Sequence, residues 1–339
     1  MTDMAKQYTQ IKHMSTYLPE AVESNEDIAV QCGRTDVEAL QDEYGITFRH
    51  RAAHNETALD MAVKAGRLVL DQEHGSKPDF ILYCTQSPEY YLPSGACIIQ
   101  HRLGLPDTIG ALDINLGGSG FIYGLSMADG LLQSGTAHRI LFITADTMSR
   151  HVYPRDCIGR ALFGDAAAAA LICLSETPGL HAVATGTDGT GYRAVMVPRG
   201  GMRKRFDPGR PEVPVPGGDS IRTDNHLFLD RDAVNRAAEK RISSLIASVL
   251  MDSGLSADDI ACVMINQCSR NVVRWVCNHT GIDRKKLYAD MSMYGDTGSS
   301  YFALGLETLF KDKRVPAGTP VLLCGFGPGF SWGGALITF

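Results

Sequence analysis

One stretch limits the possible folds of this chain more than any other: residues 113–125, where a strand, a glycine turn and a helix follow one another. The apolar run 111–115 predicts a buried strand, and residues 116–120 predict a tight turn. Apolar residues then recur at helical spacing, at Phe121, Leu125 and Leu132. Such a turn presents one residue at a helix N-terminus, where backbone N–H groups stabilise a thiolate or an oxyanion. We expect that residue to be Gly118, which has no side chain.

Continuous apolar runs elsewhere predict further strands that are buried on both faces of a sheet. Including the strand at 111–115, the predicted strands are Phe80–Cys84, Ala111–Asn115, Arg139–Ala145, Ala166–Leu174, Cys262–Asn266, Pro320–Gly325 and Ala335–Phe339. Helical patterns lie between them, at Thr57–Gln72, Ser94–Leu103, Phe121–Ser134, Arg231–Ser253, Arg270–Thr280 and Ser300–Phe310. Alternating strands and helices indicate an α/β fold. Because the plan is similar in both parts, we predict two related halves, at residues 1–180 and 181–339.

An irregular segment, about residues 186–230, lies in the second half next to this boundary. It is rich in Pro and Gly, especially over residues 198–201 and 208–218. Loops of this length in compact enzymes usually cover a functional site, and we expect this one to do so. A disordered insertion is the alternative.

Composition excludes several classes of protein. The 339 residues are 44% hydrophobic and 21% charged, which is typical of a soluble globular protein. A net charge of -6 gives no reason to expect binding to nucleic acid or to anionic membranes. The sequence shows no apolar run long enough to span a bilayer and no signal peptide, so we expect a cytoplasmic protein.

The nine cysteines stand singly, without a C-x-x-C pair or the His/Cys spacing of a zinc site. Most lie in apolar runs, so we expect buried free thiols in a reducing compartment and no bound metal.

Four glycine-containing segments, in this order, carry a specific resemblance. They are Gly120-Phe121-Ile122-Tyr123-Gly124-Leu125, Leu162-Phe163-Gly164-Asp165-Ala166-Ala167-Ala168-Ala169, Tyr294-Gly295-Asp296-Thr297-Gly298-Ser299-Ser300 and Gly325-Phe326-Gly327-Pro328-Gly329-Phe330-Ser331-Trp332-Gly333-Gly334-Ala335. Over essentially its whole length, the chain resembles the β-ketoacyl-acyl-carrier-protein synthase III family of the thiolase superfamily. The resemblance implies a five-layered α-β-α-β-α fold of two related halves, normally a homodimer. It also implies acyl thioesters of a carrier protein or coenzyme A as substrates, with no bound cofactor.

All three catalytic positions of that family are substituted in this chain. The family's nucleophilic Cys, two residues before the Gly of the Gly-Phe pair, corresponds to Gly118. The family's His, which opens a segment after a strand, corresponds to Asn266, and its Asn in Tyr-Gly-Asn-Thr corresponds to Asp296. Asn266 retains a hydrogen-bond donor that could polarise a thioester carbonyl. Asp296 replaces a donor with a carboxylate that suits either general-base work or a helix cap.

Other positions agree with the family in part. The resemblance makes Gly329, with Gly118, a source of oxyanion-hole N–H groups, and makes Tyr90-Tyr91-Leu92 the loop that reaches the partner's acyl pocket. Two arginines of the family's carrier or coenzyme A entrance are absent. One is replaced around Glu43-Tyr44-Gly45-Ile46 and the other falls at Cys157, which weakens the case for coenzyme A as donor.

Three nearby or unmatched features have simpler interpretations. Ser119 is a replacement nucleophile only if a base lies within about 3 Å, and a packed side chain is the alternative. Cys268 is expected to be a packed thiol. The histidines outside the motifs are expected at the surface or as caps: His50, His101, His138, His151 and His279.

The sequence leaves three hypotheses about function. The first is a synthase III-like acyltransferase that moves an acyl group directly to an acceptor, with Asp296 as base. The second is a non-catalytic subunit that pairs with an intact ketosynthase in a heterodimer. The third is an engineered variant of an active enzyme from which the nucleophile was removed.

Overall fold

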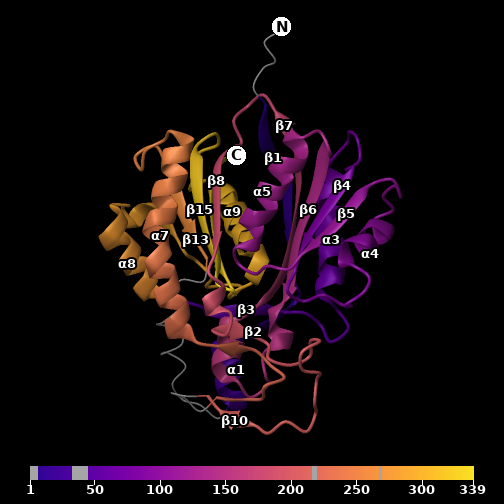
Figure 1. Ribbon diagram of the computed structural model, residues 1–339, viewed down its shortest axis with the longest axis vertical. Helices are drawn as coiled ribbons and strands as arrows, with labels where there is room; N and C mark the ends of the chain where they lie inside the picture. The colour runs from indigo at the N-terminus through magenta and orange to yellow at the C-terminus, as the bar shows by residue number, and fades with distance from the viewer. Residues whose placement is uncertain (1–6, 33–44, 216–219, 267–268) are drawn as a thin grey trace.

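The computed structural model describes residues 7–32, 45–215, 220–266 and 269–339 (Figure 1). Glu43, Tyr44 and Cys268 lie outside these ranges. Within them, no helix is both long enough and apolar enough to cross a membrane.

The first half forms a mixed five-stranded sheet in the order β1-β7-β6-β4-β5. Its strands are β1 (Tyr8–Tyr17), β7 (Asp165–Ser175), β6 (Arg139–Thr147), β4 (Phe80–Cys84) and β5 (Gly110–Ile114). Strand β4 is parallel to β5 and β6, whereas β7 is antiparallel to β1 and β6. Parallel strands need crossover connections, which the intervening helices provide.

The second half forms a sheet of the same size, in the order β14-β13-β15-β16-β8. Its strands are β14 (Leu287–Tyr288), β13 (Cys262–Ile265), β15 (Pro320–Gly327), β16 (Ser331–Thr338) and β8 (Leu180–Thr187). The predicted boundary between the halves falls at the start of β8, because all strands of the first sheet end before it. A separate two-stranded antiparallel sheet pairs β2 (Ala21–Ser24) with β3 (Phe48–Arg51).

Helices form three further layers around and between the sheets (Figure 1). The outer layer of the first sheet is α3 (Ala58–Gln72) with α4 (Gly95–Arg102), and that of the second is α7 (Arg231–Ser253) with α8 (Arg270–Thr280). Between the sheets lie α5 (Gly120–Gln133) and α9 (Tyr301–Lys311). This arrangement is the five-layered thiolase fold that the resemblance implied.

Caps account for where several helices begin and end. The Thr57 hydroxyl accepts a hydrogen bond from Asp60 N–H while the Asp60 carboxylate accepts one from Thr57 N–H, so a capping box starts α3. Asp230 caps α7, which ends at Gly254 in the left-handed conformation. Both α7 and α8 have the bounds that the sequence predicted.

The prediction that every strand is buried on both faces is wrong for β5. This strand lies at the edge of its sheet, and Leu112 is 41% exposed. The sequence analysis also missed β1, because its polar residues interrupt the apolar run that was taken as the strand signal.

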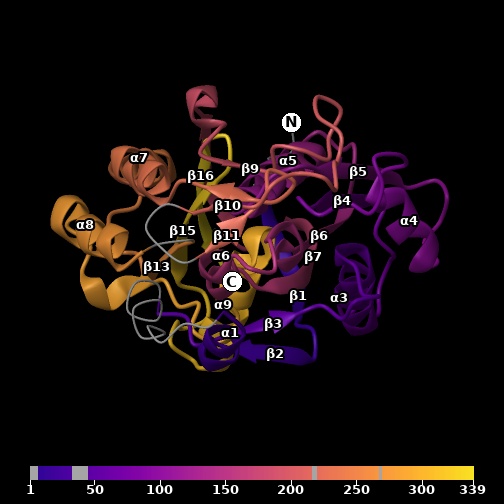
Figure 2. The same ribbon diagram turned by 90° about the horizontal axis from the view of Figure 1, so that it is seen from below.

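The segment at residues 186–230 has more structure than its composition suggested. Four short strands pair within it: β10 (Val213–Pro214) with β11 (Ile221–Arg222), and β9 (Val195–Met196) with β12 (Phe228–Leu229). Figure 2 labels β9, β10 and β11. Backbone hydrogen bonds from Ile221 N–H to Arg155 O (3.1 Å) and from Leu227 N–H to His151 O (2.7 Å) attach it to the first half. We call it the cover segment.

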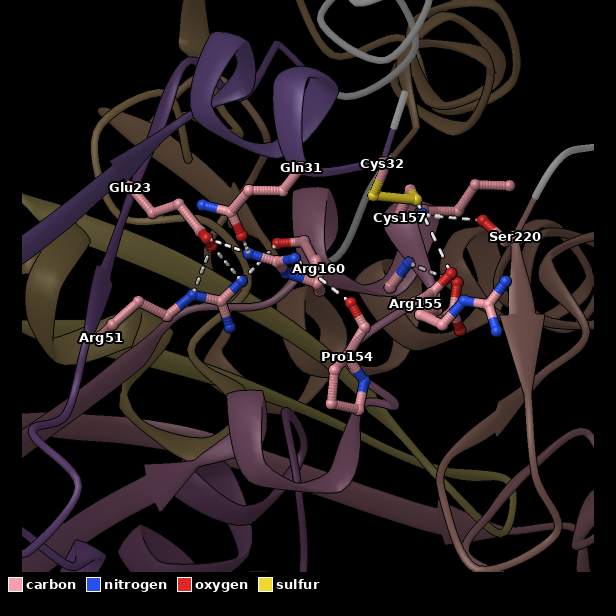
Figure 3. The surroundings of a disulfide bond; sticks show 12 residues. Glu23, Gln31, Cys32, Arg51, Pro154, Arg155, Cys157, Arg160 and Ser220 are labelled. Atoms are coloured by element: carbon pink, nitrogen blue, oxygen red, sulfur yellow. Dashed lines mark hydrogen bonds and ion pairs between the residues drawn. A yellow bond between two sulfur atoms is a disulfide. The ribbon is translucent and has the colours of Figure 1, made fainter. Parts of the chain in front are cut away.

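The expectation that all cysteines are free thiols is wrong, because Cys32 and Cys157 form a disulfide. It joins the end of α1 (Asn25–Cys32) to the start of α6 (Cys157–Leu162), two helices that contact each other (Figure 3). The two residues are 125 positions apart, so their separation in sequence gave no signal of the pairing.

Candidate functional site

Gly118 lies in a turn with no room for a side chain. A Cβ atom at this position would lie 1.8 Å from Asn266 Nδ2 and 2.4 Å from the carbonyl oxygen of Phe326. Distances below 3.0 Å to non-bonded heavy atoms require one of the groups to move. The space that a nucleophilic side chain would occupy is therefore filled by the Asn266 carboxamide.

Asn266 follows β13 and is 1% exposed. Its Nδ2 donates to Phe326 O (2.9 Å), and its Oδ1 accepts from Phe326 N–H (2.6 Å). The carboxamide thus forms hydrogen bonds with both the C=O and the N–H of Phe326 in β15. The donor that was expected to polarise a thioester carbonyl makes a hydrogen bond to the protein itself.

Asp296 lies in the segment between β14 and α9, and it is 2% exposed. Its Oδ1 accepts from Gly298 N–H (3.0 Å), and its backbone forms an isolated bridge to Phe163. The same residue lines the cavity described below. Its position is therefore compatible with both roles that the sequence suggested, a general base and an Asp that caps backbone N–H groups.

Ser119 occupies the N-cap position of α5 without a side-chain capping hydrogen bond, and it is fully buried. Its Oγ is 2.7 Å from Ser331 Oγ, which in turn donates to Pro328 O at 3.2 Å. Neither contact supplies the base that a serine nucleophile requires. Ser119 therefore joins the glycine turn to the hairpin of β15 and β16.

Gly118 and Gly329 each carry a backbone N–H without a hydrogen bond to any residue in the described ranges. The turn that contains Gly329 is held by Asp188, whose backbone exchanges two hydrogen bonds of 2.8 Å with Phe330. Gly329 has φ of 137°, a conformation that favours glycine.

A cavity of about 240 Å³ lies beside the glycine turn, between the first turns of α7 and the hairpin of β15 and β16. We call it the central cavity. Its apolar wall includes Met148, Leu162, Phe163, Val195, Leu229, Phe326, Pro328, Phe330 and Trp332, and its polar lining includes Gln86, Asp188, Asn235 and Asp296. Four cations of α7 also line it: Arg231, Arg236, Lys240 and Arg241. The cover segment contributes Asp188, Val195 and Leu229 to this lining.

Gln86 and Asp146 are site residues that the sequence analysis missed. The Asp146 Oδ1 accepts from Gln86 N–H (2.7 Å), and its Oδ2 accepts from Ser299 N–H (3.0 Å) and Ser299 Oγ (2.6 Å). Asp146 thereby links β6 of the first half to the Asp296–Ser299 turn of the second. Its complete burial raises its pKa to about 6, although these hydrogen bonds act in the opposite direction.

His151, which we expected at the surface or as a cap, lies against the same loop with its ring beside Gln86 and Ser87. Its Nε2 is 3.0 Å from Gln86 O and 3.3 Å from Ser87 Oγ, and burial lowers the pKa of the ring. Gln86 is thus held through its backbone by Asp146 and His151 while its side chain lines the central cavity. Its place after β4 was the available signal, since the carboxyl ends of parallel strands commonly carry site residues.

The predicted dimer loop stands at the surface of the single chain. Tyr90, Tyr91 and Leu92 are 59%, 64% and 87% exposed, three adjacent large apolar side chains. None of them lines the central cavity.

Comparison with known proteins agrees with this architecture. Residues 112–189 match the family model described as 3-Oxoacyl-[acyl-carrier-protein (ACP)] synthase III, and residues 250–339 match the model of its C-terminal part. The chain is 31% identical over 335 residues to a β-ketoacyl-[acyl-carrier-protein] synthase III of Neisseria meningitidis serogroup A, covering 98% of this chain and 100% of the relative.

Solved structures show the same similarity in three dimensions. A 2.1 Å crystal structure of a 3-oxoacyl-(acyl-carrier-protein) synthase III superimposes with a TM-score of 0.93 at 34% identity, covering 98% of this chain and 100% of that one. The priming β-ketosynthase of the R1128 polyketide biosynthetic pathway superimposes with a TM-score of 0.83 at 26% identity, covering 98% and 96%. In sequence and in fold, this chain belongs to the 3-oxoacyl-[acyl-carrier-protein] synthase III family.

Proposed function

We propose that this protein is a ketoacyl synthase III-like acyltransferase that moves an acyl group directly from a thioester to an acceptor. The donor is an acyl thioester of a carrier protein or coenzyme A, and the pathway makes fatty acids, polyketides or other secondary metabolites. One observation carries the proposal: the Asn266 carboxamide fills the space of a side chain at Gly118. An acyl-enzyme at this position has no room to form, and the transfer takes place in a ternary complex.

In this mechanism Asp296 is the general base. Its carboxylate takes the proton of an acceptor hydroxyl as the hydroxyl oxygen attacks the thioester carbonyl carbon. The C–S bond then breaks, and the leaving thiolate takes from Asp296 the proton that the carboxylate had accepted, which restores the base. The position of Asp296 in the lining of the central cavity supports this role.

The carbonyl oxygen needs hydrogen-bond donors as negative charge develops on it. We assign this task to the backbone N–H groups of Gly118 and Gly329, and Gln86 of the cavity lining is a further candidate donor. Asn266 contributes indirectly, because its bonds to Phe326 fix the wall behind Gly118.

The cations of α7 support a phosphate-bearing or acidic thioester carrier. Arg236 and Lys240 are exposed beside the cavity, and Arg241 stacks on the Trp332 ring with 4.7 Å between the guanidinium carbon and the ring centroid. Phosphopantetheine and carrier proteins are anionic, so this rim attracts either donor.

Mass spectrometry of the intact protein during turnover tests the proposal. Incubation with acyl-pantetheine, acyl-coenzyme A and acyl-carrier protein should leave the protein mass unchanged while product forms with a hydroxyl acceptor. A stable acyl adduct on the protein would contradict direct transfer. A family member with its cysteine is the positive control for adduct detection.

The non-catalytic subunit is the second candidate, because a filled position at Gly118 also fits a chain without catalysis, whereas Asp296 in the cavity lining favours the acyltransferase. The exposed Tyr90-Tyr91-Leu92 loop supports a partner chain in either case, a second copy or an intact ketosynthase. Co-purification from the native host distinguishes the two: a homodimer that turns over a thioester alone excludes the subunit hypothesis. The fit between Gly118 and Asn266 argues against an engineered change at position 118 alone.

A further inference from the structure

A second cavity, of about 330 Å³, adjoins the central cavity beneath the cover segment. We call it the side cavity. Phe163, Leu229 and Arg231 line both cavities, so the two share a wall. A transfer reaction with two bound reactants needs space for a donor and an acceptor, or for the long arm of a carrier. The side cavity offers that additional space next to the central cavity, which Asp296 lines.

Arg222 of β11 gives the side cavity a specific chemistry. Its guanidinium carbon lies 4.2 Å from the centroid of the Phe228 ring, so the planar cation stacks on the aromatic face. It makes no hydrogen bond or ion pair with any residue in the described part of the chain. The side chain is half-buried, and this burial lowers the pKa of its guanidinium. A stacked guanidinium with unused donors matches the geometry of a carboxylate or phosphate.

The acidic residues of the side cavity do not serve as this partner. Asp156 Oδ1 accepts from Gly159 N–H (3.0 Å) and caps α6. Asp230 Oδ1 accepts from Ala233 N–H (3.0 Å) and caps α7. Asp232 is exposed in the first turn of α7. The negative charge of Asp156 raises the pKa of Arg222, but the two side chains form no ion pair.

We propose that Arg222 binds an oxyanion of one reactant in the side cavity and makes the protein selective for substrates that carry such a group. The group is a carboxylate on the acyl chain or acceptor, or the phosphate of the phosphopantetheine arm. This inference rests on the proposed function, because it assigns the anion to a reactant of the same transfer.

Equilibrium binding to small probes tests the assignment without requiring turnover. Titration calorimetry compares phosphopantetheine with pantetheine, and malonyl-pantetheine with acetyl-pantetheine, in the native protein and in R222M. Methionine keeps apolar contact with Phe228 while removing the donors. We expect at least one anionic probe to bind the native protein about tenfold or more tightly than its neutral counterpart, and R222M to lose this preference.

The pair that loses its preference identifies the anion as phosphate or carboxylate. R203Q, which removes an exposed cation of the cover segment outside both cavities, should retain the preference. The proposal is overturned if the native protein shows no preference in either pair, or if R222M shows the same preference as the native protein. An acyl adduct or absent turnover would end the proposed function but would leave these binding constants interpretable.

Discussion

The two sides of the candidate site differ in packing: one is filled by protein atoms, and the other lines a cavity. On one side, Gly118, Ser119 and Asn266 are buried and fully packed against the hairpin of β15 and β16. On the other side, Gln86 and Asp296 line the central cavity. In a family member with a nucleophile, chemistry would begin on the first side. In the proposed mechanism the packed side fixes the geometry and supplies the Gly118 N–H, and the open side supplies the base at Asp296.

The largest expected effect is on the open side, at Asp296. D296N keeps an oxygen that can accept from Gly298 N–H but loses the base, so we expect turnover to fall by about a hundredfold or more. Steady-state kinetics with an acyl thioester and a hydroxyl acceptor measure this, with binding of the donor unchanged. D252N, at an exposed position late in α7, is the matched control. Native-like turnover in D296N would remove the basis for a reaction on this side.

A side chain added on the packed side should affect stability first. G118C forces Asn266 and the Phe326 carbonyl apart, and overpacking of this kind costs about 1–3 kcal/mol of unfolding free energy. Denaturant unfolding measures the loss. G130C is the control within α5, because a Cβ at Gly130 meets no atom within 4 Å.

G118C also tests whether the Asn266 side chain occupies the space at position 118, as opposed to the position merely lacking a nucleophile. In the N266A background the cost of G118C should be smaller, because the atom at 1.8 Å is gone. An equal cost in both backgrounds would show that Asn266 does not compete for this space.

A smaller effect is expected at Gln86. Q86A removes a neutral donor from the cavity lining without touching the backbone bonds to Asp146 and His151, so kcat/KM should fall about tenfold. Q133A, at the end of α5, serves as control. If Q86A and Q133A behave alike, the carbonyl oxygen depends on backbone donors alone.

The sequence predicted the framework better than the site. Strand β4 and helices α7 and α8 lie at the predicted residues, because continuous apolar runs and helical periodicity are local signals. The filling of the Gly118 position by Asn266 is not local, since it depends on two chain segments that meet only in the fold. The sequence analysis missed the place of Gln86 in the cavity lining and the Cys32–Cys157 disulfide for the same reason.

The smallest expected effect concerns Asp146, whose hydrogen bonds to Gln86 and Ser299 link the two halves of the fold. Its pKa is raised to about 6 in the fold, whereas an exposed Asp titrates near 3.9, so the folded protein binds a proton that the unfolded chain has lost. This contribution to stability is present at low pH and is lost as pH rises through about 6.

We therefore expect the unfolding free energy of the native protein, relative to D146N, to fall by about 1 kcal/mol between pH 5 and pH 6. Denaturant unfolding across this range provides the measurement, and the comparison with D146N cancels the opposite trend from carboxylates such as Glu73, whose pKa is lowered. A difference that does not change with pH would mean that Asp146 is ionised throughout and joins the two halves as a charged acceptor.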